Sequence, residues 1–242
     1  MKACIAQTKP IKGNIKKNIE NHIKLIELAI ANNVDIIVFP ELSITGYEAE
    51  LAEELATTAE DKRFDIFQDI TDANSIVIAI GLPIRKPIGI CIGLAIFQPN
   101  EPRTTYSKKH LHPGEEKYFV PGENGEIIKI DDSKIGFAIC YETSIQEHTN
   151  SLCKNGIDIY MASVLDTVGG VDKDLNRISN TAKKQNITAL MANFVGKSGG
   201  YDCAGKSSIW NTNGLVLEQL DDINEGIAIM NTKTQETFKI QL

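Results

Sequence analysis

The stretch that decides the fold runs from Val34 to Tyr47 and reads VDIIVFPELSITGY. Its first half, Val34–Phe39, is a short apolar run rich in β-branched residues, which is typical of a strand buried on both faces. Pro40 ends this strand, because proline has no N–H to donate to a neighbouring strand. Glu41 therefore stands just beyond a buried strand, where open α/β sheets bind their ligands. Taken alone, a glutamate at a strand exit is more often a solvated surface residue than a catalytic one.

Helical and extended patterns alternate on either side of this strand. Lys2–Gln7 is predicted as a strand, and isoleucines at positions 15, 19, 23, 26 and 30 recur at helical spacing, which predicts an amphipathic helix over 14–32. A second helix is expected around 60–73, before another buried strand, Ile76–Leu82. This β-α-β-α-β order favours an α/β layered fold.

Beyond residue 82 the pattern contains strands that follow one another without a helix between them. The remaining elements are predicted as strands Ile88–Gln98, Thr104–Ser107, Ile127–Ile130 and Lys134–Ile139, a helix around 144–155, strand Ile157–Met161, a helix through Val171, Leu175, Ile178 and Ala182, and strands over 187–195, 206–210, 215–220 and 226–231. We expect sheets with both parallel and antiparallel pairs, and helices outside them. No repeat or linker interrupts the chain, so a single domain over 1–242 is predicted, without a fused second catalytic domain.

The composition is that of an ordinary soluble protein. Lys and Arg number 25 and Asp and Glu 32, so the net charge is −7, which argues against nucleic-acid or anionic-membrane partners. Neither a secretory signal nor an apolar run of about 18 residues is found, so no membrane span is expected. The five cysteines are scattered and odd in number. We therefore expect reduced thiols in a cytoplasmic protein.

Two further segments place reactive side chains at the ends of strands. Side chains alternate along a strand, so Lys108 would share the face of Tyr106 and Lys109 would take the other. The apolar strand Lys134–Ile139 stops at Cys140, where a strand-to-helix elbow would suit a nucleophile. Backbone N–H groups after Cys140 would lower the pKa of its thiol and form part of an oxyanion hole. The plainer alternatives are a solvated basic pair and a small buried thiol.

Taken together, the three segments resemble the nitrilase, or carbon–nitrogen hydrolase, superfamily. Its blocks read roughly F-P-E-L-x-x-T-G-Y, Y-x-K-x-H-L and G-x-x-I-C-Y-D/E. This chain has FPELSITGY from Phe39, YSKKHL from Tyr106 and GFAICYE from Gly136. The resemblance covers nearly the whole chain, selects Lys108 over Lys109, and implies a four-layer α-β-β-α sandwich with two mixed sheets.

The resemblance also implies an activity, which is hydrolysis of a small non-peptide amide through a thioester on Cys140. Glu41 would be the general base, and Lys108 with the backbone N–H of Tyr141 would stabilise the oxyanion. No metal or organic cofactor is required. Family members commonly pair, so a homodimer or a higher homo-oligomer is expected.

Two more residues follow from the resemblance. A second glutamate is implied upstream of Pro121-Gly122, and counting back favours Glu115, with Glu116 as the alternative if the spacing differs by one residue. Tyr47, which closes the glutamate block, is expected to contact the substrate.

Several alternatives stay open at this level. The same residues could hydrolyse a nitrile or transfer the acyl group to another amine, although Tyr141 after the cysteine is more typical of amidases than of nitrilases. A catalytically inactive binding module is a further alternative. Ser144–Glu147 departs from the family's usual Arg-Phe-Pro-Glu ending, so this loop does not select among a dicarboxylate monoamide, a carbamoyl-amine and an amino-acid amide.

Other motif matches lack the structure that their chemistry needs. Gly200–Ser207 matches the phosphate-binding pattern G-x-x-x-x-G-K-S, but Ser208-Ile209-Trp210 leads straight into the turn Asn211–Gly214 and leaves no room for the required helix. Gly196–Gly200 matches the serine nucleophile elbow and lacks a following helix in the same way. His110 and His112 lack the other ligands of a metal site, so structural roles are expected for them.

Overall fold

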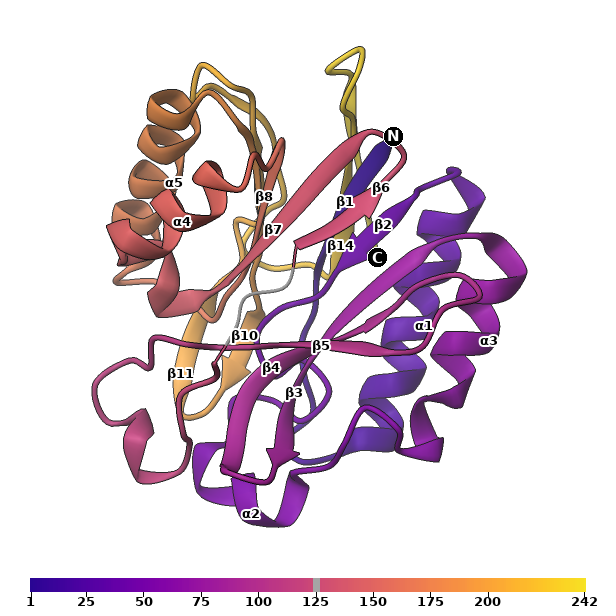
Figure 1. Ribbon diagram of the computed structural model, residues 1–242, viewed down its shortest axis with the longest axis vertical. Helices are drawn as coiled ribbons and strands as arrows, with labels where there is room; N and C mark the ends of the chain where they lie inside the picture. Colours follow the sequence, from indigo (N-terminus) through magenta and orange to yellow (C-terminus); the bar gives the residue numbers. More distant parts are fainter. Residues whose placement is uncertain (124–126) are drawn as a thin grey trace.

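Two β-sheets lie face to face in the middle of the molecule, and helices cover their outer faces (Figure 1). The computed structural model describes residues 1–123 and 127–242. In the described part of the chain, the first sheet has the strand order β15-β14-β1-β2-β3-β4-β5 and the second the order β13-β12-β9-β8-β7-β6. The expected four-layer α-β-β-α sandwich with two mixed sheets is therefore confirmed.

The first sheet contains strands from both ends of the chain. Its strands and covering segments are β1 (Lys2–Gln7), α1 (Ile15–Ala31), β2 (Ile36–Val38), η1 (Ala49–Leu51), α2 (Ala52–Leu55), η2 (Lys62–Phe64), α3 (Asp65–Asn74), β3 (Val77–Lys86), β4 (Gly89–Phe97), β5 (Thr104–Ser107), β14 (Gly226–Asn231) and β15 (Thr237–Gln241). β1, β2 and β3 are parallel, and the outer pairs are antiparallel. The helices α1 and α3 lie on the outer face of this sheet (Figure 1).

The second sheet is built from the middle of the chain. Its elements are β6 (Ile127–Ile130), β7 (Ser133–Ile139), η4 (Cys140–Ser144), α4 (Gln146–Lys154), β8 (Ile159–Ser163), α5 (Val171–Gln185), β9 (Thr188–Ala192), β12 (Ser208–Trp210) and β13 (Val216–Gln219). β7, β8 and β9 are parallel, and α4 and α5 cover their outer face (Figure 1). The turn η3 (Glu115–Lys117) and the hairpin β10 (Val195–Ser198) with β11 (Tyr201–Ala204) stand apart from both sheets.

The alternation of side chains along the strands creates three buried layers. In β1, Ala3 and Ile5 point between the sheets, whereas Cys4 and Ala6 point towards the helices. Phe137 and Ile139 of β7 meet the same inter-sheet core from the second sheet. A strand buried on both faces must be apolar throughout, which explains the continuous apolar runs in the sequence.

The expected elements are present, with shifted ends and some omissions. The predicted strand Val34–Phe39 is shorter, Ile36–Val38, and the helix expected around 60–73 begins at Asp65. Prediction missed the last strand, β15, and the hairpin β10–β11. The segment Gly200–Ser207, which resembles a phosphate-binding loop, contains β11 and leads directly into β12, so no helix follows it and that motif is correctly rejected.

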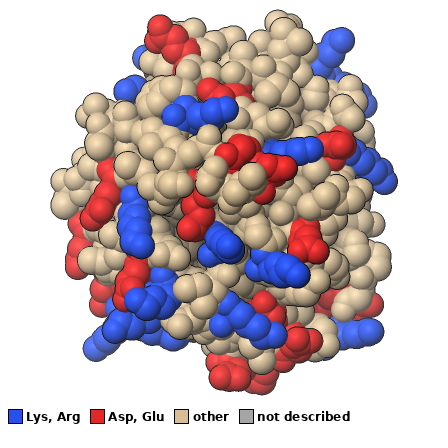
Figure 2. Space-filling view, turned by 180° about the vertical axis from the view of Figure 1, so that it is seen from behind, with Lys and Arg blue, Asp and Glu red and all other residues tan. Residues whose placement is uncertain are grey.

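No helix in residues 1–123 and 127–242 is both long and apolar enough to cross a bilayer. On the face seen in Figure 2, Lys and Arg side chains are interspersed with Asp and Glu.

Candidate active site

The three predicted reactive residues come together where strands of the two sheets end. Glu41 follows β2, Lys108 follows β5 and Cys140 follows β7. The ends of the sheets are joined at this point, because the Ser163 hydroxyl of β8 donates a hydrogen bond to the Phe39 carbonyl at 2.8 Å. Residues that are 99 positions apart in sequence thus face one cavity, which contains both Glu41 and Cys140.

Lys108 is held between two carboxylates in the interior. Its ammonium lies 2.7 Å from Glu41 Oε1 and 2.9 Å from both oxygens of Glu115. Lys108 and Glu41 are fully buried, and Glu115 is 4% exposed. A buried charge is costly unless it is paired and hydrogen-bonded, so each member of this cluster depends on the others. Lys109, in contrast, is exposed, as the strand alternation predicts.

The structure places Glu115 in the cluster and Glu116 outside it. Glu115 also accepts hydrogen bonds from the Tyr47 hydroxyl at 2.6 Å and from the His112 backbone N–H at 2.7 Å. Glu116 is exposed and accepts from the Gly114 N–H. The Tyr47 ring lines the cavity, but its hydroxyl is already engaged with Glu115.

The turn that carries Glu41 is built against Gly81 of β3. A Cβ atom at Gly81 would lie 2.3 Å from the Pro40 carbonyl oxygen and 2.4 Å from the Leu42 nitrogen. The Gly81 N–H donates to the Ser43 hydroxyl at 3.1 Å, and its carbonyl accepts from the Ile44 N–H at 2.9 Å. Only glycine allows the backbone of this turn to approach so closely.

Cys140 sits on the expected elbow between β7 and the 3-10 turn η4, with a φ of 45°. A positive φ is uncommon for a residue other than glycine and often marks a functional site. The partly buried thiol donates to the Leu165 carbonyl at 3.5 Å. The expectation of a lowered thiol pKa is wrong for this site: burial raises the pKa of Cys140, Glu41 raises it further, and Lys108 offsets only part of this. The thiol is therefore protonated at rest and needs a base.

Glu41 has the properties of that base. Burial raises its pKa to about 7, against the lowering effect of Lys108, and the neighbouring Glu115 raises it further. Its second oxygen, Oε2, is buried and has no hydrogen-bond partner among residues 1–123 and 127–242. The Cys140 thiol is close enough to influence the Glu41 pKa by hydrogen bonding. A carboxylate that titrates near neutral pH is well matched to proton transfer.

Glu142 ties the elbow of Cys140 to the segment of Lys108. Its Oε2 accepts from the Tyr106 hydroxyl and from the Ile139 N–H, and its Oε1 accepts from the Lys109 N–H at 2.7 Å. Glu142 is fully buried. One carboxylate thus fixes the ends of β5 and β7 relative to each other, because charge-assisted hydrogen bonds are stronger and shorter than neutral ones.

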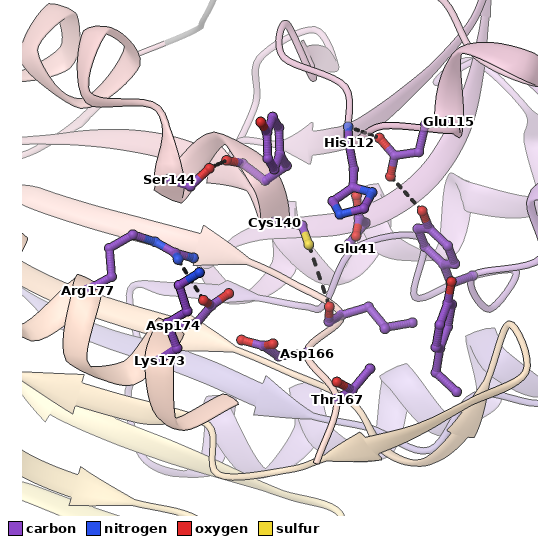
Figure 3. Close-up of a pocket in the computed structure, with 14 residues that line it drawn as sticks. Glu41, His112, Glu115, Cys140, Ser144, Asp166, Thr167, Lys173, Asp174 and Arg177 are labelled. Carbon is purple, nitrogen blue, oxygen red and sulfur yellow. Dashed lines mark hydrogen bonds and ion pairs between the residues drawn. The ribbon is translucent and has the colours of Figure 1, made fainter. Parts of the chain in front are cut away.

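The cavity beside Cys140 has a volume of about 390 Å³ (Figure 3). Sequence reasoning assigned five of the lining residues, Glu41, Tyr47, Glu115, Cys140 and Tyr141, together with Lys108 behind them, and missed the other nine lining residues. The unpredicted lining residues are His112, Ser144, Leu165, Asp166, Thr167, Lys173, Asp174, Arg177 and Tyr201. A signal existed for Asp166, which is a polar residue shortly after β8, in the same relation to its strand as Glu41. Lys173, Asp174 and Arg177 sit on α5 and carry no such signal.

Among the described residues, no group of three or more His, Cys, Asp or Glu side chains is arranged to hold a metal ion. His110 is packed edge-on against His148. His112 packs edge-on against Tyr141 at the cavity, so its ring contributes to the wall.

The sequence of this chain is similar to those of known carbon–nitrogen hydrolases and related proteins. The carbon-nitrogen hydrolase family model matches residues 2–237. A glutamine-dependent NAD(+) synthetase of Acinetobacter baylyi is 27% identical over 233 residues, which cover 93% of this chain and 42% of that protein. A probable nitrilase of Schizosaccharomyces pombe is 26% identical over 241 residues, covering 94% of this chain and 87% of the relative.

The fold is also similar to that of solved proteins. An amidase from Nesterenkonia sp. AN1, in a structure with acrylamide added at its active-site cysteine, superimposes with a TM-score of 0.85 at 20% identity. The superposition covers 96% of this chain and 92% of the amidase. The chain spans less than half of the NAD(+) synthetase and most of the nitrilase and the amidase.

Proposed function

Because this chain belongs to the carbon-nitrogen hydrolase family, we propose that it hydrolyses a small, non-peptide amide through a thioester on Cys140, releasing ammonia or an amine. The observation that carries the proposal is the buried Lys108 ammonium, held between Glu41 and Glu115 beside the Cys140 thiol. Burial works to lower the pKa of Lys108, but Glu41 and the other acidic neighbours outweigh it and raise the pKa. Lys108 is therefore a permanent cation, suited to stabilise negative charge and unsuited to act as a base.

The first half of the reaction forms the thioester. The Cys140 proton moves to Glu41 Oε2, and the sulfur attacks the amide carbonyl carbon. The carbonyl oxygen becomes an oxyanion, which Lys108 and the Tyr141 N–H stabilise. The first N–H groups of a helical turn have no partner within it, which leaves the N–H of Tyr141 free for this role in η4. The carbon–nitrogen bond then breaks, and the leaving nitrogen takes the proton from Glu41.

The second half removes the acyl group. Glu41, a carboxylate again, accepts a proton from water, and the resulting nucleophile attacks the thioester carbonyl. The carbon–sulfur bond breaks, the acid leaves, and the thiolate recovers its proton from Glu41. Throughout, Glu115 positions Lys108, and Tyr47 positions Glu115 through the hydroxyl hydrogen bond.

An amide is favoured over a nitrile by one feature of the chain, which is Tyr141 directly after the cysteine. Hydrolysis and acyl transfer share the same thioester, so the choice between them depends on the acceptor that enters the second half. A panel of small amides and nitriles, scored for ammonia release and for the acid produced, with and without an added amine, separates these outcomes.

Cys140→Ala should abolish ammonia release from every amide in the panel, because no other nucleophile faces the carbonyl in this scheme. Cys153→Ala is the matched control, since Cys153 is also partly exposed but lies on α4 and does not line the cavity. Cys153→Ala should keep its activity, and ammonia release by Cys140→Ala at the rate of the unmodified protein would overturn the proposal.

A further inference from the structure

Asp166 stands out among the cavity residues that the reaction scheme does not use. Its backbone is fixed at both ends: its N–H donates to Asn193 Oδ1 at 2.8 Å, and its carbonyl accepts from the Ala204 N–H at 2.9 Å. The preceding residue, Leu165, supplies the carbonyl that faces the Cys140 thiol. The side chain of Asp166 is therefore held at the cavity, next to the reacting sulfur (Figure 3).

The carboxylate of Asp166 lacks a cation of its own. Asp166 is only 8% exposed, and its Oδ2 is buried with no hydrogen-bond partner in the part of the chain that the structure describes. The guanidinium of Arg177 binds Asp174 at 2.6 Å and the Thr143 hydroxyl at 2.8 Å, and its buried Nε has no hydrogen-bond partner among residues 1–123 and 127–242. Buried polar groups in native proteins are nearly always satisfied, so an exception that faces a cavity points to a ligand.

Acidic side chains outnumber basic ones around the cavity by one when Lys108, which backs it, is counted. Four acidic side chains line it, namely Glu41, Glu115, Asp166 and Asp174, against two basic ones, Lys173 and Arg177. Lys108 neutralises part of the charge of Glu41 and Glu115, and Arg177 that of Asp174. Lys173 is exposed and pairs with no carboxylate among the described residues. Burial and the neighbouring Asp174 raise the pKa of Asp166 to about 7, against the lowering effect of Arg177. A cation bound at Oδ2 would offset both costs, and Figure 3 shows Asp166 turned towards the Asp174 side.

We propose that Asp166 recognises a protonated amine of the substrate, so that the preferred substrates are small amides that also carry an ammonium group. This inference rests on the proposed function and specifies its substrate class. An ammonium has three donors and no acceptor, so one of its N–H groups can satisfy Oδ2 and it brings no second acceptor next to the carboxylate. An amide that carries a carboxylate at this place would meet Asp166 with a like charge instead.

Pairs of amides that differ only in a terminal methyl or ammonium test this directly. The pairs are butanamide with β-alaninamide, pentanamide with 4-aminobutanamide, and hexanamide with 5-aminopentanamide. Their dissociation constants are measured by ligand-observed NMR on the Cys140→Ala protein, and kcat/KM is measured on the unmodified protein. At one chain length at least, the ammonium member should bind about tenfold more tightly or better, which is the scale of a charge-assisted hydrogen bond.

Asp166→Asn should reduce this preference towards one, mainly through weaker binding of the ammonium member. Asp172→Asn is the matched control, because Asp172 is exposed, pairs with Lys206 and does not line the cavity, so the preference should be retained. Equal or better binding of the alkyl member at all three lengths would overturn the inference, and this comparison needs no variant of Asp166. Equal losses for both members in Asp166→Asn would also overturn it, since they would assign Asp166 a structural role in the cavity wall.

The two proposals fail in distinguishable ways. Ammonium-selective binding without any ammonia release would leave this inference standing and overturn the proposed function. Ammonia release at equal rates from both members of every pair, without selective binding, would leave the proposed function standing and overturn this inference.

Discussion

At the scale of single residues, the pKa of Glu41 sets how the reaction should depend on pH. Burial raises this pKa to about 7, and the scheme needs the ionised carboxylate to accept the thiol proton. Activity should therefore be present above about pH 7 and lost below it, by about tenfold per pH unit. The apparent value belongs to the coupled group of Glu41, Lys108, Glu115 and Cys140 rather than to one residue.

A pH profile of kcat/KM checks this expectation. Glu41→Gln should lower kcat/KM steeply and remove the acidic limb, because glutamine cannot take up the proton. A profile that stays flat from about pH 5 to 8 in the unmodified protein would contradict the role of Glu41 as base.

At the scale of elements, Glu142 joins the end of β5 to the elbow after β7. Glu142→Gln replaces one acceptor oxygen with an NH₂ group that faces backbone N–H donors, so it should lower the free energy of unfolding by about 1–3 kcal/mol. It should also lower kcat more than it changes KM, because the positions of Lys108 and Cys140 depend on this link. Chemical denaturation and steady-state kinetics measure the two effects.

Glu147→Gln is the matched control for Glu142. Glu147 is exposed on the first turn of α4, so the same change of side chain should alter stability by less than about 0.5 kcal/mol. Equal effects of the two substitutions would mean that the Glu142 link does not hold the site together.

A second prediction at the scale of elements concerns the turn after β2, which packs against Gly81. A methyl group at Gly81 would collide with the backbone of Pro40 and Leu42 on both sides of Glu41. Gly81→Ala should therefore destabilise the protein by about 1–3 kcal/mol or more and displace Glu41. Gly169→Ala, at an exposed glycine with no atom within 4 Å of the added Cβ, should change neither stability nor activity by a comparable amount. A Gly81→Ala protein with unchanged melting and activity would contradict this account of the turn.

These elements also explain which parts of the structure were predictable from sequence. Strands buried on both faces leave long apolar runs, so both ends of β1 and β7 were found within one residue, whereas β3 continues four residues beyond its predicted end. The alternation along β5 correctly separated buried Lys108 from exposed Lys109. β15 and the hairpin β10–β11 were missed, because their side chains are partly exposed and polar and give little periodic signal.

The residues of the site also divide into those that the sequence pattern revealed and those that it did not. Glu41, Lys108 and Cys140 each follow a recognisable strand, and their blocks resemble a known family. The part of the cavity wall that α5 supplies was not predictable, because Lys173, Asp174 and Arg177 reach the cavity only after α5 has packed onto the second sheet. The direction of the Cys140 pKa was misjudged for a related reason, since burial depends on tertiary packing and outweighs the effect of Lys108.

At the scale of the whole molecule, the site exists because two sheets pack face to face and bring the ends of their parallel strands to one cavity. The pairing of subunits stays a prediction from the family resemblance. Sedimentation equilibrium at micromolar concentration should give a mass of twice 26.6 kDa or a higher multiple. A mass of one chain under these conditions would contradict it.

The central claim is that the acyl group of an amide passes through Cys140, and intact-mass and peptide analysis after rapid acid quenching tests it most directly. During turnover of a good amide, a fraction of the protein should gain the mass of the acyl group, and the mass should map to the peptide that contains Cys140. The Cys153→Ala protein should show the same adduct, and the Cys140→Ala protein none. An adduct on another residue, or turnover by Cys140→Ala at the rate of the unmodified protein, would contradict the account.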